Sequence, residues 1–247
     1  MSGSNDAAAA ALKSQPSLLV KVYLAIYNLV SAALWANIFV HAVAHLLHGL
    51  QTGEGGLAGL RASSATLYGR VELMYVAQSL AVMELLHSLT GLVRSAFITA
   101  FMQVMSRLLV LWGVVYTFPE TRSTLGFTLL TLSWSFVEIP RYLFYAVNTF
   151  SSSPYPLLWL RYSLFAVLYP TGITGEILTW LAALPSIERH RPFSLPMPNR
   201  FNLPFDSYYL TLFLLALYIP GSYIMYTHML VLRRKMLSPD ASKPKQH

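Results

Sequence analysis

The sequence predicts an all-α integral membrane protein built as a six-helix transmembrane bundle. Of its 247 residues 55% are hydrophobic and only 11% are charged, whereas about a quarter of the residues in ordinary soluble domains are charged. A helix that crosses a bilayer core of about 30 Å needs roughly 20 mostly apolar residues. Six stretches have this length, and they leave no room for a soluble domain.

Each predicted span is a long apolar stretch bounded by polar residues, Gly or Pro. The approximate bounds are Leu18–His48, Val71–Gly91, Ala96–Phe118, Thr124–Asn148, Leu157–Ala183 and Ser207–Leu232. Ser17 can cap the first span, and Pro140 predicts a kink in the fourth. The Gly-rich stretch 49–70 is expected to be a loop, and 185–206, with five prolines, is expected to run along the membrane surface.

The domain organisation follows from these spans. We expect a disordered tail over 1–17, one transmembrane domain over 18–232, and a basic cytosolic tail over 233–247. Six spans place both termini on one side. That side carries eight Lys and Arg residues and the other carries six, which favours cytosolic termini. Lys243 and Lys245 also have the spacing of a dilysine signal for return to the endoplasmic reticulum.

Two features of the composition exclude other kinds of site. The chain has no cysteine, so disulfides, thiolate metal sites and cysteine nucleophiles are excluded. The formal charge of +7 comes mostly from scattered residues, so nucleic acid is not an expected partner. The run Arg233, Arg234 and Lys235 follows the last span and is typical of an anchor near anionic lipid headgroups.

Three histidines mark the end of the first span. His41, His45 and His48 are spaced i, i+4, i+7 on one helical face, as in the first histidine box of membrane desaturases and hydroxylases. A di-iron site of that kind needs many more histidines, and the other four are scattered. We therefore predict no metal site and interpret the cluster as the polar, interfacial end of a long helix.

Charged residues inside the predicted spans are expensive to bury and therefore indicate pairing or function. They are Glu84, Glu138, Glu176, Arg107 and Arg141. We expect Glu84 to pair with Arg107 and Glu138 with Arg141, mainly to fix helix packing. Glu176 has no evident local partner, which makes it the strongest candidate for a reactive acid.

Tyr169 and Glu176 stand seven residues apart in the fifth span, so they share one helical face. Pro170, Gly172 and Gly175 lie around them and could kink the helix and leave room for a ligand. One interpretation is a substrate site, with a carboxylate as general base and a phenol as general acid or hydroxyl donor. The other is a kinked packing helix with a snorkelling tyrosine.

Four segments carry a resemblance to a known family. They are MELLHSLTGLVRS at 83–95, QVMSRLLVLWGVV at 103–115, WSFVEIPRYLFYAVN at 134–148 and LRYSLFAVLYPTGITGEI at 160–177, which contains Y-P-x-G-x-x-x-E. They resemble the very-long-chain (3R)-3-hydroxyacyl-CoA dehydratases, also called protein tyrosine phosphatase-like proteins. A phosphatase of that type needs a cysteine, so the older name finds no support here.

The resemblance implies a six-span enzyme of the endoplasmic reticulum that catalyses the third step of fatty-acid elongation. Its substrate would be (3R)-3-hydroxyacyl-CoA and its product trans-2-enoyl-CoA, and its partners would be membrane lipid and the elongase, ketoreductase and enoyl reductase of the cycle. The family's catalytic residues fall on Tyr169 and Glu176. Its buried polar residues match Glu84, Arg107, Glu138 and Arg141; Pro140 departs from the family pattern.

The implied dehydration needs a base at C2, an acid for the departing hydroxyl and a donor to the thioester carbonyl, but no metal or redox cofactor. We assign the base to Glu176 and the acid to Tyr169, with the reverse left open. Arg94 and Arg161 are candidates for the CoA phosphates, by position alone. At 1.5 Å per residue Glu176 lies about 28 Å into its span, so the substrate must enter deeply.

Two other functions are compatible with buried charges. A small-solute transporter usually shows an internal repeat, and none is evident in this sequence. A non-catalytic membrane scaffold would explain paired charges but gives Tyr169 and Glu176 no task.

Overall fold

The computed structural model describes residues 17–51, 71–93, 97–200, 202 and 204–238. Within these ranges the regular elements are helices, apart from one isolated β-bridge between Leu195 and Phe205. The prediction of an all-α protein is therefore confirmed. Arg94, Lys243, Lys245, residues 1–16 of the predicted tail and residues 52–70 of the predicted loop lie outside the described residues.

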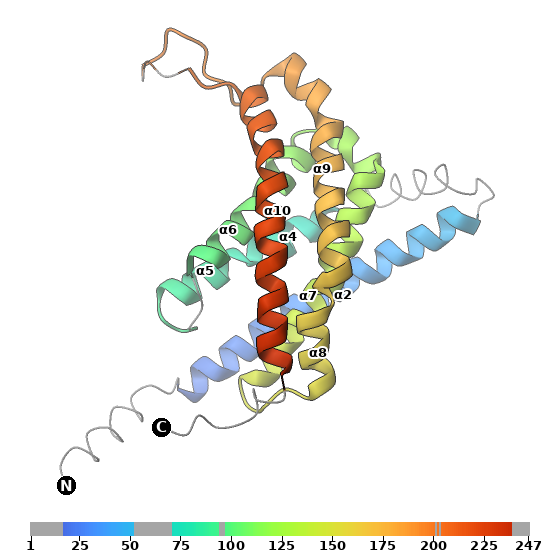
Figure 1. The fold of residues 1–247 in the computed structure, drawn as a ribbon, viewed down its shortest axis with the longest axis vertical. Helices are drawn as coiled ribbons and strands as arrows, with labels where there is room; N and C mark the ends of the chain where they lie inside the picture. The colour runs from blue at the N-terminus through green and yellow to red at the C-terminus, as the bar shows by residue number, and fades with distance from the viewer. Residues whose placement is uncertain (1–16, 52–70, 94–96, 201, 203, 239–247) are drawn as a thin grey trace, which may run out of the picture.

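The helices follow the predicted spans in order (Figure 1). They are α2 (Leu18–Gln51), α4 (Val71–Leu80), α5 (Val82–Leu89), α6 (Phe97–Leu108), the π-helix η2 (Leu109–Tyr116), the 3₁₀ helix η3 (Pro119–Ser123), α7 (Leu125–Asn148), α8 (Tyr155–Ser163), α9 (Phe165–His190) and α10 (Ser207–Leu237). The backbone N–H of Val20 bonds to Ser17 Oγ, so the predicted cap of the first span is present.

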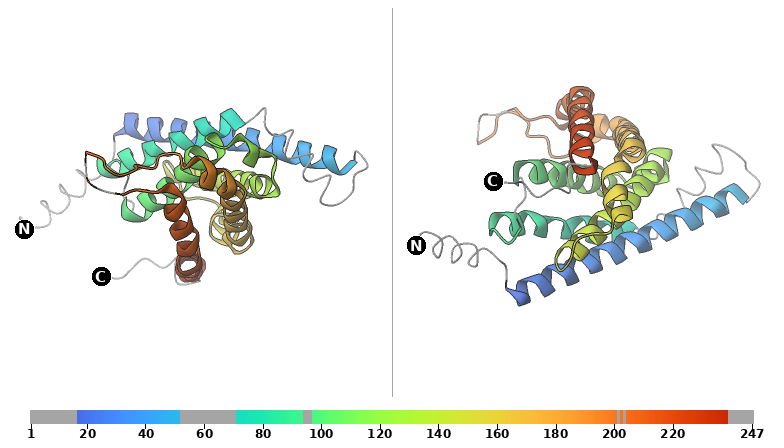
Figure 2. Two further views of the ribbon diagram at one scale, coloured as in Figure 1. Left: turned by 90° about the horizontal axis from the view of Figure 1, so that it is seen from above. Right: turned by 60° about the horizontal axis from the view of Figure 1, so that its bottom comes forward.

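Helix α7 lies at the centre of the molecule. It packs against α2 on one side and α9 on another, while α10 packs on α8 and α9. Figure 2 shows α2 along one side of the molecule and α10 on the opposite side. This central position explains why α7 buries polar side chains, among them Thr128, Thr131, Ser133 and Ser135. The hydroxyls of Thr131 and Ser135 each donate a hydrogen bond to the backbone carbonyl one turn earlier. These two hydroxyls therefore have a partner without water.

The α2 helix packs through one stripe of residues at seven-residue intervals, two of which, Ala42 and Gly49, are small. Asn28, Trp35, Ala42 and Gly49 are all buried, and this spacing keeps one stripe of the helix on one face. Small residues let helix backbones approach closely in a membrane, where packing rather than burial from water drives association.

Four helical segments are long and apolar enough to cross a membrane: Leu18–Gln51, Phe97–Tyr116, Tyr155–His190 and Ser207–Leu237. The predicted count of six spans is therefore not confirmed. The predicted span Val71–Gly91 is interrupted at Ala81, where i to i−3 hydrogen bonds replace the α-helical pattern. Helix α7 has sufficient length but is less apolar, because it carries several serines and threonines as well as Glu138 and Arg141.

Several predicted boundaries are wrong by a few residues. Helix α9 continues through Pro185 to His190 and ends where Arg191 adopts a left-handed conformation, φ 45°. Helix α10 continues to Leu237, so the first residues of the predicted C-terminal tail are helical. Both Pro140 and Pro170 lie inside continuous helices, and the break in the fifth span falls at Leu164 instead.

Candidate active site

The carboxylate of Glu176 on α9 is held by two donors from neighbouring helices. Trp134 on α7 donates its ring N–H to Oε1 over 3.0 Å, and Tyr218 on α10 donates its hydroxyl to Oε2 over 2.8 Å. Glu176 has no local partner, as expected, but the folded chain supplies two donors that are each 42 residues away in the sequence. Each carboxylate oxygen thus has one fixed donor, so the orientation of the acid is set by three helices.

The sequence interpretation missed Trp134 and Tyr218. Trp134 stands four residues before Glu138, hence on the same helical face as that buried acid, and this spacing could have identified it. Tyr218 is one of many tyrosines in apolar helices, and nothing in its local sequence distinguishes it. Only the packing of α10 on α9 brings it to Glu176.

Tyr169 lies two turns before Glu176 on α9 and is partly exposed. Its ring lies 6.1 Å from that of Tyr226 on α10, measured between centroids. Among the described residues its hydroxyl has no hydrogen-bond partner, in contrast to the engaged carboxylate of Glu176. The phenol is therefore available to a bound molecule without first breaking a bond to another side chain.

The two glycines near Glu176 do not open space for a ligand as predicted. A Cβ on Gly175 would stand 2.5 Å from the backbone nitrogen of Leu130 and 2.9 Å from the carbonyl oxygen of Gly126. A Cβ on Gly172 would contact Ser133 at 3.4 Å. Both glycines face α7, and Gly175 is where the two helix backbones touch.

The remaining charges of the predicted spans form one network rather than two separate pairs. Glu138, with a side chain 3% exposed, accepts hydrogen bonds from both Arg107 and Arg141. Arg141 also binds Glu84 through two N–H···O bonds of 2.8 Å, and Tyr142 donates to Glu84 over 2.6 Å. The prediction that Glu138 pairs with Arg141 is confirmed, but Glu84 pairs with Arg141 and not with Arg107.

This network reaches Glu176 through one aromatic ring. The guanidinium carbon of Arg107 lies 5.1 Å from the centroid of Trp134, within the distance at which a cation is attracted to an indole face. The N–H of the same indole bonds to Glu176. Two arginines and two glutamates neutralise each other in the network, and the carboxylate of Glu176 lies at its end.

Arg161, one of the two arginines proposed for CoA phosphates, is not part of this cluster. Arg161 on α8 donates to the hydroxyl of Tyr145 over 3.2 Å and lies near the rings of Tyr145 and Tyr162. It thus faces α7. Arg94 lies outside the described residues.

No group of three or more His, Cys, Asp or Glu side chains within the described ranges is placed to hold a metal ion. His41, His45 and His48 follow one another along the last turns of α2. His87 is buried elsewhere, where it bonds to the hydroxyl of Tyr23 over 2.9 Å.

Comparison with known families supports the same assignment as the motifs. The family model of protein tyrosine phosphatase-like protein, PTPLA, matches residues 78–239. The chain belongs to the PTPLA family. The matched residues include every helix that contributes to the charge network and to the surroundings of Glu176.

Curated relatives of this PTPLA protein match along almost their whole length. Very-long-chain (3R)-3-hydroxyacyl-CoA dehydratase PASTICCINO 2A of Oryza sativa subsp. japonica is 41% identical over 90% of this chain and 96% of its own. The dehydratase hpo-8 of Caenorhabditis elegans is 36% identical over 92% of this chain and 99% of its own. The dehydratase 2 of Homo sapiens is 37% identical over 89% of this chain and 82% of its own. No solved structure matches the chain.

Proposed function

We propose that this PTPLA protein is a very-long-chain (3R)-3-hydroxyacyl-CoA dehydratase, a hydro-lyase that forms trans-2-enoyl-CoA in the third step of fatty-acid elongation. The observation that carries the proposal is the match to relatives named as such dehydratases over nearly their full length. The protein would act at the endoplasmic reticulum membrane beside the elongase, ketoreductase and enoyl reductase of the cycle.

In this proposal Glu176 removes the C2 proton and Tyr169 protonates the departing hydroxyl. The carboxylate is fixed by Trp134 and Tyr218, which suits a base that must meet one particular C–H bond. The unpaired phenol of Tyr169 lies on the same face and can donate to the hydroxyl. The charge network of Glu84, Arg107, Glu138 and Arg141 would hold α5, α6 and α7 in register behind this pair.

The activity test uses purified protein and a (3R)-3-hydroxyacyl-CoA, with enoyl-CoA formation as the readout. Glu176→Gln and Tyr169→Phe should each lower kcat by roughly 10² to 10⁴, the range for loss of a general acid or base. Glu72→Gln and Tyr223→Phe are matched controls, because both side chains are exposed and should leave turnover unchanged. Normal turnover by either site variant would refute its catalytic role.

A second substrate separates the two roles. Chloride leaves without a proton, so a 3-chloroacyl-CoA needs the base but no acid. With this substrate Tyr169→Phe should recover elimination and Glu176→Gln should not. Recovery by Glu176→Gln alone would reverse the assignment.

A further inference from the structure

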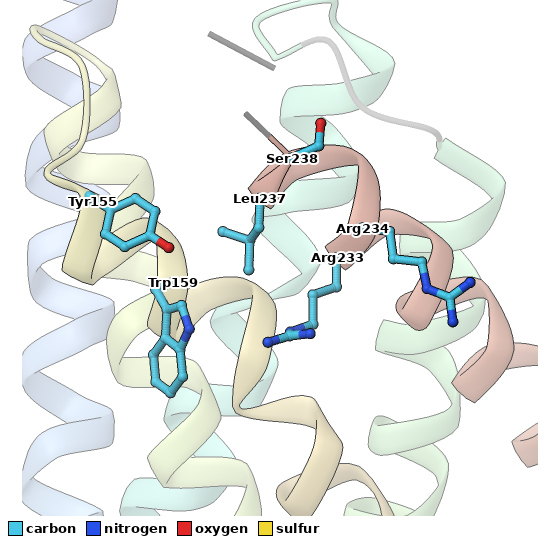
Figure 3. Close-up of a pocket in the computed structure, with 6 residues that line it drawn as sticks. All are labelled: Tyr155, Trp159, Arg233, Arg234, Leu237 and Ser238. Carbon is cyan, nitrogen blue, oxygen red and sulfur yellow. The ribbon is translucent and has the colours of Figure 1, made fainter. Parts of the chain in front are cut away.

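A cavity of about 350 Å³ opens where α8 begins and α10 ends. It is lined by Tyr155, Trp159, Arg233, Arg234, Leu237 and Ser238. Figure 3 shows the rings of Tyr155 and Trp159 on one wall, with Leu237 and the guanidinium of Arg233 directed toward them, while Arg234 points to the other side. Figure 1 shows that this end of α8 and α10 lies on the same side of the molecule as the start of α2.

The cavity combines exposed aromatic rings with cations that have no acidic partner among the described residues. Tyr155 is 65% exposed and Trp159 is 43% exposed. None of the ion pairs in the described part of the chain involves Arg233 or Arg234. Arg233 is nevertheless held in place, because its Nε donates to Ser163 Oγ over 3.1 Å. This bond joins the last turns of α8 and α10 and leaves the outer nitrogens of the guanidinium free to bind an anion.

We propose that this cavity binds the adenosine bisphosphate head of the CoA thioester, with Trp159 stacking on adenine and Arg233 binding phosphate. The inference rests on the proposed dehydratase function. A flat aromatic surface beside a guanidinium matches a ligand that has both a base and phosphates. Arg234 would add long-range attraction at the rim. An anionic lipid headgroup offers the phosphate but has no base to stack on the ring.

The distance along the helices fits the length of the substrate. Ten residues separate Trp159 from Tyr169, about 15 Å of helix. The pantetheine arm has the backbone length of roughly five extended residues, so it spans about 16 to 18 Å. A nucleotide at Trp159 thus places the thioester near Tyr169, with Glu176 two turns deeper.

The test compares two thioesters of the same 3-hydroxyacyl group, one of CoA and one of pantetheine, which lacks the nucleotide. Trp159→Ala and Arg233→Ala should raise KM for the CoA thioester about tenfold and leave kcat unchanged. Their kinetics with the pantetheine thioester should equal those of the unmodified protein, which also shows that they fold. Trp159→Phe should restore most of the affinity, and Lys235→Ala, next to the cavity but not in its wall, is the matched control.

Direct binding of adenosine 3′,5′-bisphosphate, measured by calorimetry, tests the site independently of turnover. Binding that is present in the unmodified protein and lost in Trp159→Ala and Arg233→Ala supports the proposal, even if the chain dehydrates neither thioester. A failure to dehydrate either thioester would refute only the proposed dehydratase function. Equal KM changes for both thioesters, or no change in either measurement, would overturn the proposal. The proposal would also be overturned if the variants bound the nucleotide normally but no longer preferred phosphatidylserine vesicles to phosphatidylcholine vesicles. The cavity would then be a lipid site.

Discussion

Tyr218 is the residue whose role depends most directly on a single hydrogen bond. Its hydroxyl donates to Glu176 Oε2, and hydrogen bonds to charged groups contribute about 1.5 to 3 kcal/mol. Tyr218→Phe should therefore lower kcat roughly 10- to 100-fold with little change in KM, because the carboxylate keeps only one of its two fixed donors. Tyr223→Phe on the same helix is the control, because Tyr223 is 73% exposed.

A double-mutant cycle distinguishes positioning of Glu176 from a general structural effect. If Tyr218 acts through the carboxylate, Tyr218→Phe should add almost no further loss to Glu176→Gln. Additive losses would show that Tyr218 acts elsewhere.

Glu138 is the acid on which two buried cations depend. Its carboxylate accepts from Arg107 and Arg141, and removing one member of a buried charge network costs about 3 to 5 kcal/mol because the remaining charges lose their partner. Glu138→Gln should lower the unfolding free energy in detergent by that amount. Glu72→Gln, the same change at an exposed site, should alter it by less than about 0.5 kcal/mol, and equal losses in the two variants would contradict the network.

At the scale of elements, the contact of α7 with α9 determines whether Trp134 reaches Glu176. The backbones meet at Gly126 and Gly175, where an added Cβ would fall within 3 Å of the facing helix in either case. Gly175→Ala should therefore separate the helices, destabilise the protein by about 1 to 3 kcal/mol and lower kcat.

Gly221 supplies the comparison for this substitution. It lies inside α10 with open space around its Cβ position, so Gly221→Ala should be neutral or stabilise the helix by about 0.5 to 1 kcal/mol. Similar melting temperatures for the two variants would refute a tight helix contact at Gly175.

For the whole molecule, the topology depends on how many helical segments cross the membrane. Four are apolar enough on their own, but the chain alternates in direction through six helical segments (Figure 1). We propose six spans with both termini cytosolic, in which the other spans shield the less apolar α4–α5 and α7 from lipid.

Glycosylation acceptors inserted at two turns separate six spans from four. With six spans an acceptor after Ser123 is modified in the lumen of the endoplasmic reticulum and one after Gly91 is not. With α2, α6–η2, α8–α9 and α10 as the only spans, the result is reversed. Tags at both ends should be reached by antibody when only the plasma membrane is permeabilised.

Hydrophobic length, charge and local spacing are properties of the chain itself, so the sequence alone determined the helical membrane architecture, the order of its helices and the shared face of Tyr169 and Glu176. It also identified the charges that form the network around Glu138, because an ionisable group in an apolar stretch is costly wherever the helix packs. It missed Arg122, which is buried although it lies between two predicted spans.

The tertiary structure decided which of these groups meet. The bond of Glu84 to Arg141 and the two bonds to Glu176 join residues 42 to 57 positions apart. The backbone contact at Gly175 lies between two helices. Helical periodicity specifies the face that a residue occupies but not the neighbour that the face will contact. For that reason the spacing of Trp134 could place it on the face of Glu138 but not beside Glu176, and Tyr218 became evident only when α10 was packed on α9.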